Sequence, residues 1–246
     1  MFNKGSRDVS THRQRALPGN AVTALRRQRE KENRYRSILE AAERLFCQKG
    51  YPNTKIQDIA QAAEVAVGTV YFYFKSKEDL LLRLMDAIAL NVRTLLGKAF
   101  QSPKPPIDRF AEAGRAFFRD FCLAAPYQLI ILLRESVGIS AEVEDRRRAI
   151  FERFHQDAAD AILEVMGEFG VADRSVAEVL AVAIAGMMEK VAYQYLIWQD
   201  RSDQLEAITT EALAFIRGGL HSVLNDLSEK AKKMERANNR QSGREV

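Results

Sequence analysis

The segment 53–81 constrains this chain most, because its pattern predicts two short helices separated by a tight turn, followed by the start of a third helix. Thr54 is placed to cap the first helix, and Gln57 follows at the spacing of a capping box. The apolar residues of that helix recur at helical spacing; they are Ile56, Ile59 and Ala60. Two short helices joined in this way are the helix-turn-helix arrangement, whose second helix enters the major groove of DNA.

The second helix, expected over 67–74, has an outer face that suits contact with DNA. Val70 and Phe74 lie one turn apart and are expected to face inward. Gly68 has no side chain and lets the backbone approach DNA closely, while Thr69 can hydrogen-bond to a base edge or touch a thymine methyl. The side chains expected to reach phosphate oxygens are Tyr71, Tyr73 and Lys77.

The run from Ile38 to Leu80 resembles the DNA-binding domain of the TetR family of bacterial regulators. The resemblance rests on many fixed offsets at once, from Leu45-Phe46 and Gly50-Tyr51 to the run GTVYFYFKSKEDL over 68–80. It covers about residues 34–82, roughly a fifth of the chain. The resemblance implies that the DNA-contact positions include Thr54, Gly68, Thr69, Tyr71, Tyr73 and Lys77.

This sequence departs from the family pattern at two neighbouring positions. Val67 stands where the family often has a basic or polar residue, and Ala66 where it often has serine. The start of the recognition helix therefore offers fewer polar groups to DNA. Lys55 either contacts phosphate or is a solvated charge, and Phe72 either joins the core or faces DNA. The complete predicted DNA-binding set is Thr54, Lys55, Val67, Gly68, Thr69, Tyr71, Phe72, Tyr73 and Lys77.

Charge is distributed unevenly along the chain. Residues 1–75 carry a net charge of +7, against +4 for the whole sequence. Positive charge therefore accompanies the helix-turn-helix, as binding to a polyanion requires. Two cysteines outside any ligand motif, three scattered histidines and the lack of a glycine-rich nucleotide loop predict no metal, no cofactor and no enzyme. The polar, basic start and the lack of a long apolar run predict no secretory signal, no membrane span and a cytoplasmic protein.

The rest of the pattern predicts an all-α chain with a small helix-turn-helix domain and a larger helical domain. We expect a basic, disordered extension over 1–30, the DNA-binding domain over 31–80, an effector-binding and dimerisation domain over 81–236, and a polar tail over 237–246. The basic stretch 26–31 either continues the first helix backwards as an arm that contacts DNA or is a solvated tail. A helix over 77–100 is expected to link the two domains.

The last two long helices, expected over 174–199 and 203–236, are unusually apolar. The first of them is apolar on more than one side, which indicates burial on all sides. Gly218 and Gly219 permit close approach of another backbone. We therefore expect a homodimer formed through these two helices, which would bind a palindromic operator; the alternative is that they only complete their own domain.

The TetR resemblance also implies a carboxy-terminal domain that often binds a small molecule and lowers DNA affinity. The expected effector is hydrophobic, either a fatty acyl compound or another apolar molecule. The candidate lining residues are Phe117, Phe121, Tyr127, Leu133, Arg134, Phe154, Met187, Met188 and Tyr193. The function predicted is a homodimeric repressor released from its operator by this ligand. The alternative is a constitutive DNA-binding protein without a ligand response.

Overall fold

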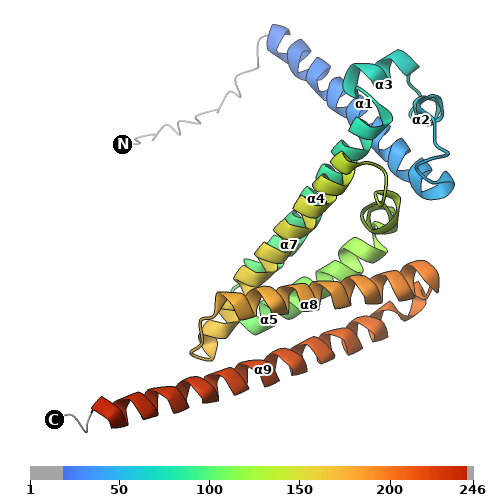
Figure 1. The fold of residues 1–246 in the computed structure, drawn as a ribbon. Helices are drawn as coiled ribbons and strands as arrows, with labels where there is room; N and C mark the ends of the chain where they lie inside the picture. Colours follow the sequence, from blue (N-terminus) through green and yellow to red (C-terminus); the bar gives the residue numbers. More distant parts are fainter. Residues whose placement is uncertain (1–18, 243–246) are drawn as a thin grey trace, which may run out of the picture.

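The computed structural model describes residues 19–242, and within that range every regular element is helical, which confirms the predicted all-α class (Figure 1). The elements are α1 (Gly19–Lys49), α2 (Ile56–Ala62), α3 (Val67–Tyr73), α4 (Lys77–Phe100), α5 (Pro106–Arg115), η1 (Ala116–Leu123), α6 (Pro126–Ile130), η2 (Ile131–Glu135), α7 (Ala141–Glu168), α8 (Arg174–Ala192), η3 (Tyr193–Trp198), η4 (Ser202–Gln204) and α9 (Leu205–Ser242). Of these, η1, η2 and η3 are π-helical, and η4 is a single 3₁₀ turn.

The helices α1, α2 and α3 enclose a small apolar core against the start of α4. Its fully buried side chains include Ile38, Phe46, Ile59, Val70 and Phe74, all at positions whose helical spacing predicts an inward direction. Burying one side chain of this size stabilises the fold by roughly 1.5–3 kcal/mol, so a few such residues hold three short helices together. The helix α1 ends before Gly50, whose φ of +82° is a left-handed conformation that favours glycine.

The larger unit is a layered bundle built on α4 and α7. Figure 1 shows these two long helices side by side, with α8 and α9 crossing below them. Arg146 of α7 pairs with Asp86 of α4 at 2.7 Å, and Arg93 of α4 pairs with Asp157 of α7 at 2.6 Å. The bundle is closed by α5 and α9, which approach so closely that a Cβ atom at Gly114 would collide with Leu213.

Both ends of the described chain are more helical than expected. The predicted disorder through residue 30 is wrong for residues 19–30, which form the first turns of α1, while residues 1–18 lie outside the described range. The predicted tail over 237–246 is also partly helical, because α9 continues to Ser242. Residues 24–30 are mostly strong helix formers, which favours the extension of α1 toward the amino terminus.

Within residues 19–242, no single helix is long and apolar enough to cross a membrane. One bent pair, 106–123 with 126–135, has sufficient length and apolar composition taken together, but its halves meet at 96°. Phe118, Phe121 and Ile131 of this pair are buried in the core of the protein. Packing against other helices therefore accounts for the apolar character of the pair.

Candidate DNA-binding face and effector pocket

The turn between α2 and α3 fixes the direction of the second helix. Glu64 takes a positive φ of +54°, an uncommon conformation for a residue with a side chain. The N–H of Val65 donates to the carbonyl of Ala60 at 2.9 Å and closes the turn. Because Val70 is then completely buried, the opposite side of α3 is turned away from the core.

The outward side of α3 is open and partly apolar. Gly68 is exposed, and a Cβ atom placed on it would meet nothing within 4 Å, so the backbone there can be approached closely. Thr69 is half-buried beside it. Tyr71 and Phe72 are 52% and 73% exposed, which assigns Phe72 to the outer face and not to the core. Val67 is half-buried at the start of the helix.

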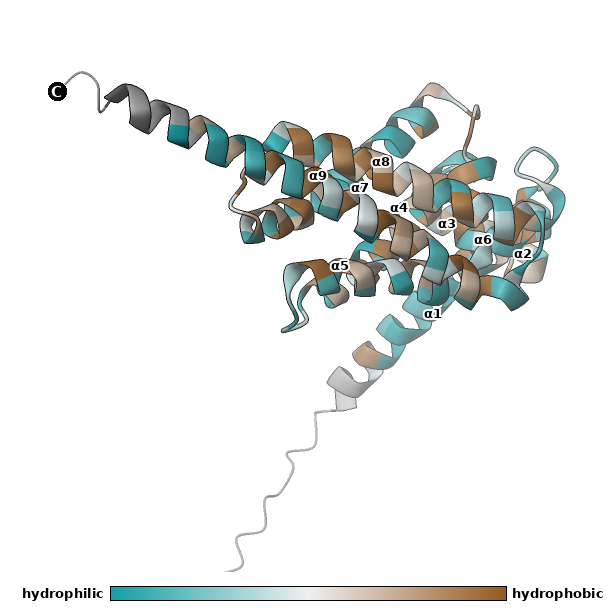
Figure 2. Ribbon diagram, turned by 90° about the horizontal axis from the view of Figure 1, so that it is seen from below, coloured by the Kyte–Doolittle hydropathy of each residue, from teal (hydrophilic) through white to brown (hydrophobic). Residues whose placement is uncertain are grey.

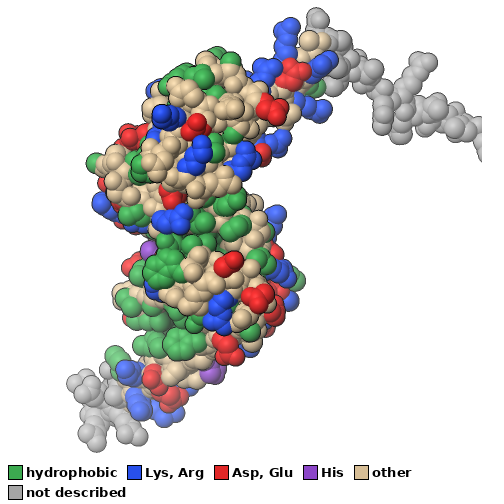
Figure 3. Space-filling view, turned by 90° about the vertical axis from the view of Figure 1, so that its right-hand side faces the viewer, with side chains coloured by type: hydrophobic (Ala, Val, Ile, Leu, Met, Phe, Trp, Pro, Cys, Tyr) green, Lys and Arg blue, Asp and Glu red, His purple; other side chains and the backbone are tan. Residues whose placement is uncertain are grey.

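The carboxyl end of α3 touches the basic extension of α1. The hydroxyl of Tyr73 donates to the carbonyl of Lys31 at 3.3 Å, and the ammonium of Lys31 lies 6.0 Å from the centre of the Phe72 ring. Residues 23–34 are all exposed and carry four arginines and one lysine against two glutamates. Figure 3 shows these basic side chains along the arm that projects from the top of the molecule. The extension thus adds positive charge next to the exposed face of α3.

Thr54 is a correction to the predicted DNA-binding set. Its side chain is 1% exposed, and its hydroxyl lies 3.2 Å from the carbonyl oxygen of Leu45 and 2.9 Å from that of Gly50. A buried hydroxyl that bonds the end of α1 cannot reach a phosphate. Thr54 does not cap α2 either: that helix is capped by Lys55, whose N–H donates to Asp58 at 3.2 Å. The Lys55 side chain itself is exposed.

Lys77 is a second correction, because its ammonium is already occupied. It donates to the carbonyl oxygens of Tyr51 at 2.8 Å and Thr54 at 3.0 Å, and lies 4.2 Å from the centre of the Tyr51 ring. Burial lowers the pKa of Lys77. The expected phosphate contact is therefore replaced by a structural one: Lys77, at the start of α4, holds the loop that leads into α2.

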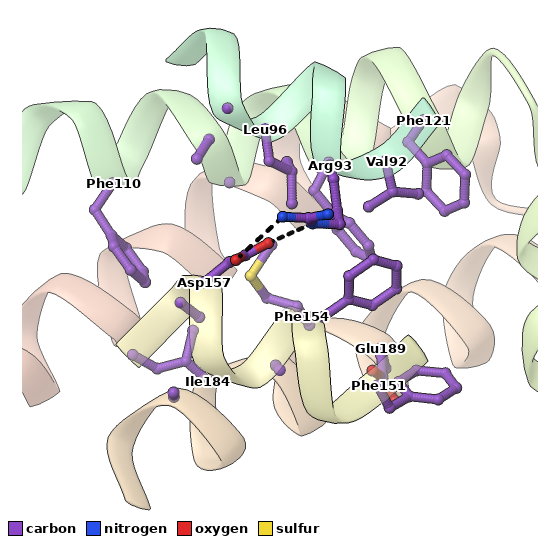
Figure 4. A pocket seen from close by; sticks show the side chains of 18 of the residues that line it. Val92, Arg93, Leu96, Phe110, Phe121, Phe151, Phe154, Asp157, Ile184 and Glu189 are labelled. Atoms are coloured by element: carbon purple, nitrogen blue, oxygen red, sulfur yellow. Dashed lines mark hydrogen bonds and ion pairs between the residues drawn. The ribbon is translucent and has the colours of Figure 1, made fainter. Parts of the chain in front are cut away.

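A cavity of about 330 Å³ lies in the larger unit between α4, α5, η1, α6, η2, α7 and α8. Its wall is mostly apolar, and Figure 4 shows aromatic rings projecting into it from several helices. The phenylalanines of the wall are Phe100, Phe110, Phe117, Phe121, Phe151 and Phe154. Such a volume and lining are typical of a small-molecule site. The π-helical segments η1 and η2 border it, as such segments often do at functional sites.

The cavity includes five of the nine predicted lining residues, which are Phe117, Phe121, Leu133, Phe154 and Met188. The other four do not line it. Tyr127 is 38% exposed on α6, and the ring of Tyr193 packs against Trp198, 5.1 Å between centroids. Met187 packs against the apolar cores on either side. Helical periodicity identifies the apolar faces but not which of them border a cavity.

Arg134 has a different role from the predicted one. Its guanidinium pairs with Glu135 at 2.8 Å, and Glu135 also accepts the backbone N–H of Tyr51 at 2.9 Å. Glu135 is only 9% exposed, so this pair is an inner contact between η2 and the loop after α1. It joins the effector unit to the DNA-binding unit, away from the cavity.

Three charged residues of the cavity wall are absent from the predicted set. Arg93 and Asp157 face each other across it, and Glu189 projects from α8 beside Phe151 (Figure 4). Arg93 lies between Val92 and Leu96 on the apolar side of α4. The sequence therefore already indicated a charge on this side of the helix. The sequence does not single out Asp157 or Glu189 in this way, because charged residues are frequent on α7 and α8 and most of them are solvated.

Residues 38–84 match the family model described as bacterial regulatory proteins, tetR family. The amino-terminal unit of the chain belongs to this family. A TetR-family helix-turn-helix therefore occupies the amino-terminal unit, where the structure has α2 and α3. The family match ends within α4, before Val92, the first residue of that helix that lines the cavity.

Individual TetR relatives match parts of the chain. The uncharacterised regulator YuxN of Bacillus subtilis (strain 168) is 27% identical over 131 residues, which are 53% of this chain and 45% of that protein. The fatty acid metabolism regulator protein of the same organism is 41% identical over 56 residues, 23% of this chain and 29% of that protein. These alignments span less than half the length of either relative.

The larger helical unit is also similar in fold to a solved structure. The transcriptional regulator FadR from Bacillus subtilis, solved in complex with stearoyl-CoA, superposes with a TM-score of 0.66 over 75% of this chain and 98% of that one. The two sequences are 19% identical over this region, so the likeness concerns the fold alone.

Proposed function

We propose that this protein is a sequence-specific transcriptional regulator that binds a palindromic operator as a homodimer and is released from it by a small apolar ligand. The observation that carries the proposal is the outer face of α3, where Gly68, Thr69 and Tyr71 are turned away from a core closed by Val70. A helix held in this way can enter a major groove without disturbing its own packing. Such a regulator would act in the cytoplasm, beside the chromosome.

Dimer formation is supported by the exposed surface of α8 and α9. Val179, Val182 and Phe215 are 69%, 51% and 73% exposed, although all three are apolar. Gly218 and Gly219 lie on the same surface with nothing near their Cβ positions. Figure 2 shows apolar residues along α8, and Figure 3 shows them gathered over the carboxy-terminal half. A second copy would cover this surface and would set two recognition helices about 34 Å apart.

Release by a ligand is supported by the position of α4. Its first turn holds the loop before α2 through Lys77, and its last three turns line the cavity. A ligand that prefers one position of α4 would change the separation of the recognition helices. A coupling of about 1–3 kcal/mol, typical of allosteric proteins, corresponds to a 5- to 150-fold change in DNA affinity.

The DNA-binding part is tested with an operator selected from random duplexes by the full chain. Gly68→Leu should abolish specific binding, because the new side chain would block the approach of the backbone to DNA. Gly167→Leu is the matched control: Gly167 is also an exposed helical glycine with open space at its Cβ position, but it lies on α7. Equal operator affinity in both variants would contradict the assignment of α3 as the recognition helix.

The ligand-response part is tested by reciprocity. A ligand that weakens operator binding must itself be bound more weakly, by the same factor, when the operator is present. Calorimetric titration of one ligand with and without operator measures both affinities. Equal ligand affinities would leave a constitutive DNA-binding protein, the alternative function.

A further inference from the structure

The proposed recognition helix α3 lacks the side chains that usually read bases through hydrogen bonds. None of its seven residues, all of which the structure describes, is charged or carries an amide side chain. In the major groove, guanine is read by arginine or lysine, adenine by asparagine or glutamine, and cytosine by a carboxylate. The usual readers of these three bases are therefore missing from α3.

The hydroxyl groups of α3 provide little discrimination between bases. Tyr73 is half-buried, and its hydroxyl donates to the carbonyl of Lys31 at 3.3 Å, so this group is occupied within the protein. Thr69 and Tyr71 also carry hydroxyls, but one hydroxyl can both donate and accept and therefore bonds more than one kind of base edge. The main remaining means of sequence selection by α3 is apolar contact.

Phe72 occupies the centre of the outer face of α3. Gly68 and Phe72 lie one turn apart, and at 3.6 residues per turn both are opposite the fully buried Val70. The Phe72 ring is 73% exposed, and the Tyr73 ring packs against it edge to face, with 5.1 Å between the ring centres. A Cβ atom at Gly68 would meet nothing within 4 Å, so there is open space one turn before the ring. This face therefore presents an aromatic surface with room beside it.

The polar side chains near this face belong to other segments. Gln57 and Gln61 are exposed on α2, and Lys55 precedes that helix. In a helix-turn-helix the first helix crosses the DNA backbone, while the second lies in the groove. The basic residues 26–31 extend from α1 beside α3 (Figure 1). Contacts from these segments go to phosphates, which position the protein but carry no sequence information directly.

We propose that Phe72 is a specificity-determining residue, which selects thymine in each operator half-site by contact with its 5-methyl group. This rests on the proposed function and names the chemical feature of DNA that the recognition helix reads. Thymine alone among the four bases presents a methyl group in the major groove, and phenylalanine is among the side chains that contact it. A G·C pair at this position would place polar groups against the ring without a hydrogen-bond partner.

The first test removes only the methyl groups from the DNA. In an operator selected by the full chain, deoxyuridine replaces the thymines of both half-sites one symmetric pair at a time, which keeps every hydrogen-bonding group of the base. Loss of one buried methyl should weaken binding about fourfold, so loss at the contacted position in both half-sites should weaken it about 16-fold. Deoxyuridine in the sequence flanking the operator is the control and should change nothing. Replacing the operator adenines by 7-deazaadenine, which lacks the N7 acceptor, should have a smaller effect.

The second test connects the methyl effect to one side chain. Phe72→Ala should bind the thymine operator about as weakly as the wild type binds the uracil operator, and should no longer distinguish the two. Leu90→Ala is the matched control, because Leu90 is also a large apolar residue, 64% exposed, but lies in the middle of α4. That variant should keep the full preference for thymine.

Equal affinity of the wild type for thymine and uracil operators at every position would overturn the proposal. The same methyl effect in the wild type and in Phe72→Ala would also overturn it, because another residue would then read the methyl. A larger loss from 7-deazaadenine than from deoxyuridine would assign the main readout to hydrogen bonds from another segment. A selected operator without methyl dependence would contradict this proposal alone. If the full chain selected no preferred duplex, the proposed function would fail together with it.

Discussion

Two threonines of the amino-terminal unit have opposite surroundings and opposite expected roles. Thr54 is 1% exposed and bonds carbonyl oxygens at the end of α1, whereas Thr69 is half-buried on the outer side of α3. The residue type is the same, and both occupy predicted DNA-contact positions. Burial and partners therefore separate a structural threonine from a candidate DNA-contacting one.

Replacing each threonine by valine should separate the two roles. Thr54→Val leaves carbonyl groups without a buried donor and should lower the free energy of unfolding by about 1–2 kcal/mol. Thr69→Val should leave stability within about 0.5 kcal/mol of the wild type, because the Thr69 hydroxyl is not part of a buried hydrogen bond, but should change the sequence selected as operator. Denaturant unfolding and operator selection are the measurements. A larger stability loss for Thr69→Val than for Thr54→Val would contradict this assignment.

The carboxyl of Glu189 predicts a pH dependence of stability. Its folded pKa of about 7 lies above the ordinary carboxyl value of 4.5, so the folded state holds the proton more tightly than the unfolded chain. The free energy of unfolding should therefore fall as pH rises from about 4.5 through 7, by at most about 3 kcal/mol at 1.36 kcal/mol per unit. Glu189→Gln should lose this part of the pH dependence, while Glu178→Gln should retain it, since Glu178 lies on the same helix but is exposed and pairs with Arg174. Parallel stability curves for wild type and Glu189→Gln would refute the pKa shift.

At the scale of elements, the amino-terminal half of α1 extends beyond the core of its own domain. Residues 23–34 are all exposed, and the contacts of Tyr73 and Phe72 with Lys31 hold this stretch beside α3. A helix without an apolar core face is maintained by strong helix formers and by pairs such as Arg26–Glu30 at 3.0 Å. Its position makes it a candidate second contact with the DNA backbone.

Neutralising this arm should weaken DNA binding through salt-dependent contacts. Arg26, Arg27 and Arg29 changed together to glutamine should reduce the slope of log affinity against log salt by up to about 0.9 per lost phosphate contact. The control changes Lys230, Lys232 and Lys233 of α9 to glutamine, which removes the same charge far from the DNA-binding unit (Figure 1). An equal slope change in both triple variants would assign the effect to net charge alone.

At the scale of the whole molecule, the single chain leaves an apolar surface uncovered. Phe215 is 73% exposed beside the open positions Gly218 and Gly219, and Val179 and Val182 extend that surface across α8. Monomeric proteins rarely expose such a contiguous surface, since its burial would be favourable. The surface belongs to the last two helices, at the opposite end from α3, so pairing there leaves both recognition helices free.

Gly219→Leu should disrupt the dimer without harming the protomer. The leucine side chain has room in a single chain, because nothing lies within 4 Å of the Cβ position, but it would hold a second chain away. Sedimentation at micromolar concentration should show a shift toward monomer, with unchanged helical content by circular dichroism. Operator affinity should fall together with dimer formation. A fully dimeric variant with wild-type DNA affinity would exclude this surface as the interface.

Local features could be predicted from residues that lie close together in the chain. Periodicity predicted α3 over 67–74 and α4 over 77–100, close to the observed Val67–Tyr73 and Lys77–Phe100. These features depend on residues within one or two turns of each other. The resemblance over 34–82 located α3, the proposed recognition helix, for the same reason, because its motif is a short contiguous run.

The tertiary structure alone decided what each functional side chain contacts. Thr54 and Lys77 occupy recognised positions, yet carbonyl groups from other segments bind them. Glu135 bonds Tyr51, 84 residues away, and Glu189 borders a cavity whose walls come from seven elements. Helical spacing specifies the side of a helix on which a residue lies. Which other helix, loop or cavity meets that side is settled only when distant segments pack together.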